Sequence, residues 1–289
     1  MSILETRNLR KIYGSGDTEV RALDGVNLSV DSGEFVAIVG TSGSGKSTLV
    51  QHLNGLLRPT SGTVKLDGRD IWEEPKKIRD VRFRVGLVFQ YPEHQLFEET
   101  VYKDIAFGPK NMGLSEEEID QRVRRAARFT GLRDELMEKS PFELSGGEKR
   151  RTAIAGVMAM EPEVLILDEP TAGLDPKGRE MILSQISAYQ RENGTTVLLV
   201  SHSMEDVART ARKVLVMNKG QVAMYAGTDE VFSRAEELTA IGLSVPAVTR
   251  IFQMLKQQGL VGGDGVYTVE QAKHILLPLL RKGEPDHAQ

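Results

Sequence analysis

A nine-residue segment, Gly40-Thr41-Ser42-Gly43-Ser44-Gly45-Lys46-Ser47-Thr48, restricts the possible folds of this chain most strongly. It matches the P-loop motif G-x-x-x-x-G-K-[ST], between an apolar run over 35–39 that predicts a buried strand and a predicted helix through Leu53. We expect the backbone N–H groups and the positive helix end there to hold phosphates, Lys46 to reach the β and γ phosphates, and the Ser47 hydroxyl to bind Mg²⁺. A glycine-rich turn without a ligand is the alternative. The expected nucleotide contacts are Gly40, Ser42, Gly43, Ser44, Gly45, Lys46, Ser47 and Thr48.

Two acidic residues follow another continuously apolar run. The run over 164–167 ends at Asp168 and Glu169, which is the Walker B pattern. A buried strand would deliver Asp168 to Mg²⁺ and its waters, and would place Glu169 to orient or deprotonate the attacking water. The alternative is that two acids simply end a strand.

A histidine follows a third apolar run, over 195–200. A lone histidine is more often a structural hydrogen-bonding group than a catalytic one. Open parallel sheets, however, bind ligands at the carboxyl ends of their strands. We therefore expect His202 to lie on the same side as the P-loop and the acids, and to sense the γ-phosphate.

The segment Leu144-Ser145-Gly146-Gly147-Glu148 opens another predicted helix. Ser145 and Glu148 fit a capping box, which by itself explains a helix start. Two glycines in the first helical turn, however, cost about 1 kcal/mol each relative to alanine. A close approach to the backbone would explain them. A phosphate at the helix N-terminus fits that need, with Ser145 and the glycine amides as donors.

The rest of the first 228 residues predicts further strands and an inserted helical region. Alternating segments over 2–9 and 19–30 predict antiparallel strands; Tyr13, between them, either stacks on an adenine ring or is ordinary partial burial. An apolar run over 85–89 predicts a buried strand that ends at Gln90. Residues 91–143 predict helices, one of them opened by a capping box at Ser115.

Composition excludes several classes of function. The 289 residues carry a net charge of −4, so no bulk positive field favours nucleic acid. The chain has no cysteine, which excludes Cys-ligated metals and fits a reducing cytoplasm. The N-terminus lacks a signal pattern, and no apolar run approaches the roughly 18 residues of a membrane span. If the protein serves a membrane, we expect it to dock on another chain.

Together these motifs resemble the ATP-binding-cassette (ABC) ATPases over residues 1 to about 228. The resemblance implies an α/β fold of the P-loop NTPase class: a RecA-like parallel sheet, an antiparallel β subdomain and an inserted helical subdomain at about 91–163. Residues 229–289 then form a small helical C-terminal appendage, with a disordered tail over 283–289. The residues that carry the resemblance are Tyr13, Gly40–Thr48, Gln90, Leu144–Glu148, Asp168-Glu169, Ala172–Asp175 and His202.

The resemblance also implies a dimer. In this family two cassettes enclose two ATP molecules, so Ser145 and Gly147 would contact the nucleotide of the opposite subunit, and Asp175 would link the two sites. Tyr13 would stack on adenine. The implied catalytic residues are Glu169, His202 and Gln90, and the implied Mg²⁺ ligands are Ser47, Gln90 and Asp168.

A narrower likeness lies in Phe89–Val101 and its continuation, Asp104–Gly113. Both segments, with the C-terminal appendage, are similar to the ATPase subunits of energy-coupling-factor (ECF) importers of vitamins and metal ions. The resemblance implies a peripheral protein on the cytoplasmic face of the cell membrane, paired with an identical or related ATPase. It implies an integral membrane scaffold protein, a separate membrane protein that captures the substrate, and no nucleic acid partner. Gln95, Leu96 and Phe97 would lie near the coupling surface, or would only pack locally.

Two other functions remain open at this level. The first is the ATPase of an ordinary binding-protein-dependent ABC importer. The second is a soluble ABC protein that uses ATP to act on nucleic acid or ribosomes; such proteins usually carry two cassettes, a long coiled coil or a basic extension, which this chain lacks. The transported substrate is not encoded in any of these motifs.

Overall fold

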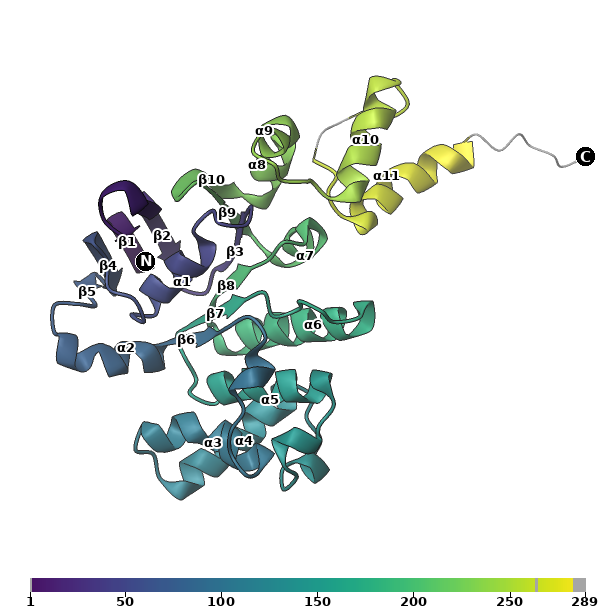
Figure 1. Cartoon of the computed structure of the whole chain (residues 1–289). Coiled ribbons are helices and arrows are strands. Elements are labelled where there is room, and N and C mark those ends of the chain that lie inside the picture. Colours follow the sequence, from purple (N-terminus) through teal and green to yellow (C-terminus); the bar gives the residue numbers. More distant parts are fainter. Residues whose placement is uncertain (1, 263–264, 283–289) are drawn as a thin grey trace, which may run out of the picture.

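Two β-sheets organise the chain, as the computed structural model shows for residues 2–262 and 265–282 (Figure 1). The larger sheet has six strands in the order β10-β9-β3-β8-β7-β6, and the smaller has four in the order β2-β1-β4-β5. The larger sheet comprises β3 (Phe35–Gly40), β6 (Val85–Val88), β7 (Val164–Asp168), β8 (Thr196–Val200), β9 (Lys213–Asn218) and β10 (Gln221–Gly227). The smaller comprises β1 (Ser2–Tyr13), β2 (Val20–Asp31), β4 (Ser61–Leu66) and β5 (Arg69–Asp70).

The larger sheet is parallel except at one edge. Strands β6, β7, β8, β3 and β9 pair in parallel, and β10 returns antiparallel to β9 through a tight turn. Strands buried on both faces need apolar side chains at every position, which is why β3, β7 and β8 are continuously apolar in sequence. Their carboxyl ends lie along one edge, and β3, β7 and β8 there lead into the P-loop, Glu169 and His202.

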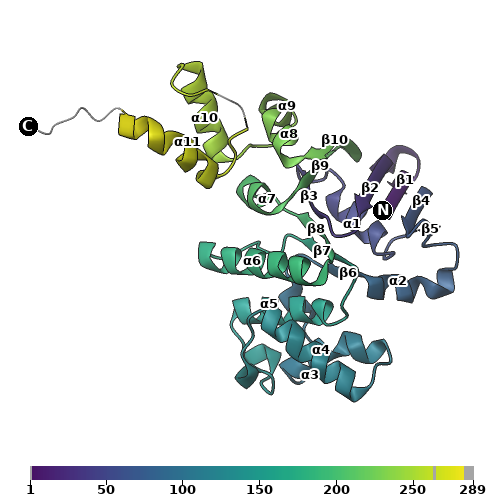
Figure 2. The same cartoon turned by 180° about the vertical axis from the view of Figure 1, so that it is seen from behind.

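Each face of this sheet buries a different set of partners. Leu165 and Leu167 of β7 point towards the cluster formed with the inserted helices and α6 (Pro176–Asn193). Val164 and Ile166 point the other way, towards α1 (Lys46–Leu53) and the antiparallel sheet. Figure 2 shows the two groups on either side of the sheet from behind. The alternation within one strand therefore ties both halves of the molecule to the same sheet.

The inserted region is helical, as predicted. It contains the short helix η3 (Pro92–Gln95), α3 (Val101–Asn111), α4 (Glu116–Phe129) and α5 (Gly146–Met158). The capping boxes predicted at Ser115 and Ser145 are both present, each with the serine hydroxyl and a glutamate three residues later. Before this region, α2 (Ile78–Arg84) leads into β6.

The C-terminal segment packs in two different ways. Val231 and Phe232 of α8 (Thr228–Ser233) and Leu238 of α9 (Ala235–Ala240) share one apolar cluster with Ala37 and Val39 of β3. Part of the expected appendage is thus continuous with the core, after α7 (Met204–Thr210). The last two helices, α10 (Ala247–Gln257) and α11 (Val269–Lys282), form a separate cluster around Phe252. Pro246 is the N-cap of α10. The expected tail, 283–289, lies outside the described residues.

In the described part of the chain, no helix combines the length and apolarity needed to span a bilayer.

The antiparallel sheet offers a test of backbone geometry. Gly62 has φ +83, and a Cβ there would lie 2.2 Å from the backbone oxygen of Asn8. We expect Gly62→Ala to lower the free energy of unfolding by about 2–4 kcal/mol, a fall of roughly 5–10 °C in Tm, because the left-handed conformation and the clash add. Gly68→Ala is the control: φ is +77, but no atom lies within 4 Å of its Cβ. Equal losses in thermal unfolding would contradict the role of the clash.

Candidate nucleotide site

The P-loop joins β3 to α1 as the motif predicts. Gly43 and Gly45 have φ values of +74 and +101, and a Cβ on Gly45 would lie 2.5 Å from the Ala22 oxygen. A Cβ on Gly40 would lie 2.4 Å from Ser44 Oγ. Glycine is therefore needed at position 45 for both conformation and space, at position 43 for conformation and at position 40 for space. Ser42 and Gly43 are exposed at the loop tip, Ser44 is buried, and Ser47 and Thr48 lie in the first turn of α1.

Lys46 is folded against the P-loop backbone. Its Nζ donates hydrogen bonds to the Gly40 oxygen at 2.7 Å and to the Thr41 oxygen at 3.0 Å. Burial lowers the pKa of Lys46, and the nearby carboxylates of Glu169 and Asp168 oppose that shift. Because this ammonium is weakly solvated, it attracts an anion such as a phosphate more strongly than a fully hydrated ammonium would.

Two buried acids face this ammonium from the end of β7. Asp168 and Glu169 are 6% and 9% exposed. Burial raises the pKa of Asp168, opposed by a hydrogen bond from the Ser47 side chain and by the charge of Lys46. Burial raises the pKa of Glu169 to about 7, and a hydrogen bond from the His202 backbone N–H opposes the shift. A carboxyl group that titrates near neutrality can accept a proton during a reaction at physiological pH.

Glu169 is also held in an unusual backbone conformation. Its φ is +52, and its N–H donates to the Val200 oxygen at 3.1 Å. A non-glycine residue in this region stores strain and is kept there by its surroundings, which is frequent at functional sites. The turn aims the Glu169 side chain towards His202, whose Nε2 lies 3.2 Å from Glu169 Oε1.

His202 follows β8 and lies beside Glu169, as expected. Burial lowers the pKa of His202, and the positive charge of Lys46 lowers it further. The imidazole is therefore mainly neutral at pH 7, so one ring nitrogen can donate a hydrogen bond and the other can accept one. Its side chain remains 54% exposed, which leaves it open towards a ligand.

Two predicted contacts lie at exposed strand ends. Gln90 lies two residues after the end of β6 and is exposed. Tyr13 ends β1, is 42% exposed, and has Lys11 Nζ 5.2 Å from its ring centroid. The site so far brings together Lys46, Ser47, Asp168, Glu169 and His202, with Gln90 at the end of a strand adjacent to β7.

The segment Leu144–Glu148, which contains Ser145, lies away from the P-loop and the two acids. Helix α5 packs in the cluster on one face of the sheet and α1 in the cluster on the other. Ser145 Oγ accepts a hydrogen bond from the Glu148 N–H at 3.4 Å. A Cβ on Gly146 or Gly147 would meet no described atom within 4 Å, so packing inside this chain does not require either glycine.

Sequence reasoning missed one buried cation close to the site. Arg150 stands in the charged run Lys149-Arg150-Arg151, which gives no sign of burial, yet it is 3% exposed. Its guanidinium donates to the Ala172 oxygen, in the loop after Glu169. Helical spacing from Ile154 places Arg150 on the inward face of α5, and this was the signal available in the sequence.

Among the described residues, no group of three or more His, Cys, Asp or Glu side chains could form a metal centre. A site for Mg²⁺ does not need one, because this ion keeps several waters and takes one or two protein oxygens beside the phosphates. Ser47 and Asp168, already in contact, fit that requirement.

In the parallel sheet the P-loop follows β3, and the two buried acids lie at the end of β7, two strands away. This arrangement defines a P-loop ATPase. The family model "ABC transporter" matches residues 23–172. The chain is 53% identical over 278 residues to the energy-coupling factor transporter ATP-binding protein EcfA2 of Clostridium tetani, covering 96% of each chain. It is 52% identical to the protein of that name from Caldanaerobacter subterraneus, covering 96% of this chain and 98% of the relative.

Solved structures agree. The chain resembles cbiO1 from Clostridium perfringens, part of the ABC transporter complex cbiONQ, with a TM-score of 0.75 and 41% identity over 88% of this chain and 99% of that one. It resembles the dimeric cassette MJ0796, bound to ADP and Pi, with a TM-score of 0.71 and 29% identity over 78% of this chain and 98% of that one. The chain therefore belongs to the ABC transporter ATPases, and among them to the energy-coupling factor ATP-binding proteins.

The raised pKa of Glu169 predicts a pH-dependent stability. The stability that this group contributes is present below the usual carboxyl pKa, near 4.5, and is lost as pH rises through about 7. Glu169→Gln removes that loss. We expect the free energy of unfolding of the variant to be about 1–2 kcal/mol higher than that of wild type at pH 8, because partial solvent access reduces the cost of the buried charge. At pH 4.5 we expect no gain.

Glu148→Gln is the control of opposite sign for this experiment. Hydrogen bonds from the Ser145 side chain and backbone lower the pKa of Glu148, so its contribution is present above the usual carboxyl pKa. Loss of this contribution in Glu148→Gln should lower the free energy of unfolding at pH 8. Denaturant titrations at the two pH values measure both effects, and a destabilised Glu169→Gln protein at pH 8 would contradict the assigned pKa.

Proposed function

We propose that this protein is the ATP-hydrolysing motor subunit of an ECF-type importer, which couples ATP binding and hydrolysis to uptake of a vitamin or metal ion through membrane partners. The observation that carries the proposal is the juxtaposition of buried Lys46 with Asp168 and Glu169 at the end of the parallel sheet. Near-full-length relatives named energy-coupling factor ATP-binding proteins support the transport class over an ordinary importer or a ribosome-acting protein.

The residues divide the work of phosphoryl transfer. Lys46 and the P-loop amides bind the triphosphate, and Tyr13 stacks on adenine. Glu169 orients the attacking water and accepts its proton, as the oxygen forms a bond to the γ-phosphorus and the bridge to ADP breaks. His202 contacts the γ-phosphate and keeps Glu169 in place. Ser47, Gln90 and Asp168 would hold Mg²⁺, which would supply positive charge against the phosphates.

A dimer completes the site in this proposal. The open space above Gly146 and Gly147 supports a second subunit whose phosphate approaches the start of α5. The solved relative MJ0796 is a dimer. Ser145 and Gly147 would then serve the partner's nucleotide, and Asp175, the N-cap of α6, would lie between the two sites. The partner is a second ABC ATPase, identical or related.

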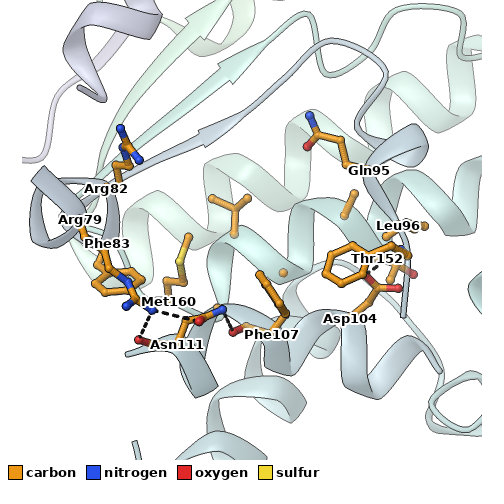
Figure 3. A pocket seen from close by; sticks show the side chains of 15 residues that line it. Arg79, Arg82, Phe83, Gln95, Leu96, Asp104, Phe107, Asn111, Thr152 and Met160 are labelled. Carbon is orange, nitrogen blue, oxygen red and sulfur yellow. Dashed lines mark hydrogen bonds between the residues drawn. The ribbon is translucent and has the colours of Figure 1, made fainter. Parts of the chain in front are cut away.

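A groove of about 430 Å³ supports contact with a membrane protein (Figure 3). It lies between α2, the segment after η3, α3 and α5, and its walls are mainly apolar. Arg79 and Arg82 stand at one end and Asp104 at the other (Figure 3). These charges complement the dipole of a single docked helix, whose negative C-terminus would face the arginines. We assign this groove to a cytoplasmic helix of the integral membrane scaffold protein, which holds the ATPase on the cytoplasmic face beside the substrate-capture protein.

The base assignment predicts a separation of binding from hydrolysis. We expect Glu169→Gln to lower kcat at least about 100-fold, with the Kd for ATP changed less than about threefold, because only proton acceptance is lost. The protein should accumulate as an ATP-bound dimer. Phosphate release and size-exclusion chromatography with ATP measure both. Glu161→Gln, which removes a carboxylate paired with Arg125 outside the site, is the control. Hydrolysis at the wild-type rate by Glu169→Gln would refute the assignment.

The groove assignment is tested by recovery of membrane proteins. Phe97 lines the groove and is 59% exposed. Its ring packs edge-on against that of Phe107, with the ring centroids 4.9 Å apart. We expect Phe97→Ser to reduce co-purified membrane proteins about tenfold or more in a pull-down from detergent-solubilised host membranes, because an apolar anchor is lost. Phe142→Ser, which alters a 67% exposed phenylalanine outside the groove, should retain them. Recovery of ribosomes or DNA alone by the wild-type protein would contradict the transport function.

A further inference from the structure

Arg150 is a buried cation whose partners come from two separate loops. Its side chain is only 4% exposed. Nε donates to Glu93 Oε2 at 3.0 Å, Nη2 donates to Glu93 Oε1, and Nη1 donates to the oxygens of Pro170 and Ala172. A buried guanidinium is tolerated only when its donors are satisfied, so this geometry fixes all three segments together.

Each of these loops begins at a residue of the proposed site. Glu93 lies three positions after Gln90, in η3, and Pro170 immediately follows Glu169. Helix α5, which carries Arg150, begins one turn earlier at the Ser145 segment. A single side chain thus joins the segments that bear Gln90, Glu169 and Ser145.

Both loops also hold a strained residue next to the guanidinium. Tyr91 and Glu169 have φ values of +55 and +52. The Tyr91 ring centroid lies 5.8 Å from Arg150 Cζ, and the carbonyl that Arg150 binds belongs to the residue after Glu169. Such conformations persist only where neighbouring groups enforce them, and Arg150 contacts both loops. The pairing with Glu93 is a charge pair: burial opposes the shift, but the hydrogen bond and charge of Arg150, together with a backbone hydrogen bond and His94, lower the pKa of Glu93.

We propose that Arg150 is a positioning residue that couples the loop after Gln90 to the loop after Glu169, so that a shift of α5 moves both. The inference rests on the proposed function. The loop after Gln90 continues into Gln95, Leu96 and Phe97 of the groove. A docked partner and a nucleotide at the start of α5 would therefore both act on Glu169 through this side chain. Arg150 itself touches no reacting atom.

The experiment compares Arg150→Met with a chemically matched control, Arg122→Met, in the purified full chain. Arg122 also donates to a backbone oxygen, that of Met160 at 3.1 Å, and pairs with a carboxylate, Glu161 at 3.5 Å. It contacts neither loop of the site. We expect Arg150→Met to lower kcat about 10- to 100-fold with the KM for ATP changed less than about threefold, because the base is misplaced while the P-loop is intact. Arg122→Met should retain wild-type kcat.

A conservative variant and a double mutant separate positioning from general destabilisation. Arg150→Lys should give an intermediate kcat, because an ammonium can bond Glu93 or a carbonyl but cannot span both loops. Adding Glu93→Gln to Arg150→Met should lower kcat no further, because both changes break one link. A further multiplicative loss of kcat in the double mutant would contradict the proposal that Arg150 and Glu93 act through one link.

Amide hydrogen exchange tests the coupling without any catalytic readout. In Arg150→Met we expect amides in 91–95 and in 171–175 to exchange about tenfold faster or more, and in Arg122→Met to exchange as in wild type. Wild-type exchange in either loop of Arg150→Met would overturn the proposal. If the wild-type chain hydrolyses no ATP, the proposed function fails, while the exchange pattern still decides the role of Arg150.

Discussion

Lys46, Asp168 and Glu169 are buried together where three strands of the parallel sheet end, and their mutual electrostatics depend on the rest of the fold. Each charge would be better solvated by water alone, which is why the pKa of Lys46 is lowered and those of both acids are raised. The fold offsets this cost through the continuous apolar strands beneath them and the P-loop carbonyls around Lys46. A bound triphosphate would add negative charge against the ammonium and, with its metal, relieve the imbalance.

Much of this arrangement follows from local sequence. The strands β3, β7 and β8 were predictable because burial on both faces requires unbroken apolar runs, and the helix starts at Ser115 and Ser145 because a capping box is a local hydrogen-bond pattern. The approach of His202 to Glu169 followed from the rule that parallel strands present their carboxyl ends at one edge. The roles of these residues in catalysis remain predictions.

Non-local features were not predictable in this way. The position of Arg150 in a run of three basic residues favours solvent exposure, and only the tertiary fold brings Glu93 and Ala172 to it. The sheet order β10-β9-β3-β8-β7-β6 depends on crossovers that no single segment specifies. The strained φ of Glu169 and Tyr91 is equally hidden, because neither residue type favours the left-handed region.

The C-terminal segment packs on the sheet in its first part and mainly on itself in its last part. Helices α8 and α9 cover apolar side chains of β3, and the turn at Gly242 lies against Thr41 of the P-loop, where a Cβ would come 3.4 Å from Thr41 Cγ2. Helices α10 and α11 close a small core of their own. A cut directly after α9 would remove Leu243 and Val245, which are buried in the same cluster as β3, and Tyr267, whose ring centroid lies 5.7 Å from that of Phe232. The C-terminal segment is therefore tied to the ATPase core at several points along its length, so shortening it there would expose apolar surface of the core.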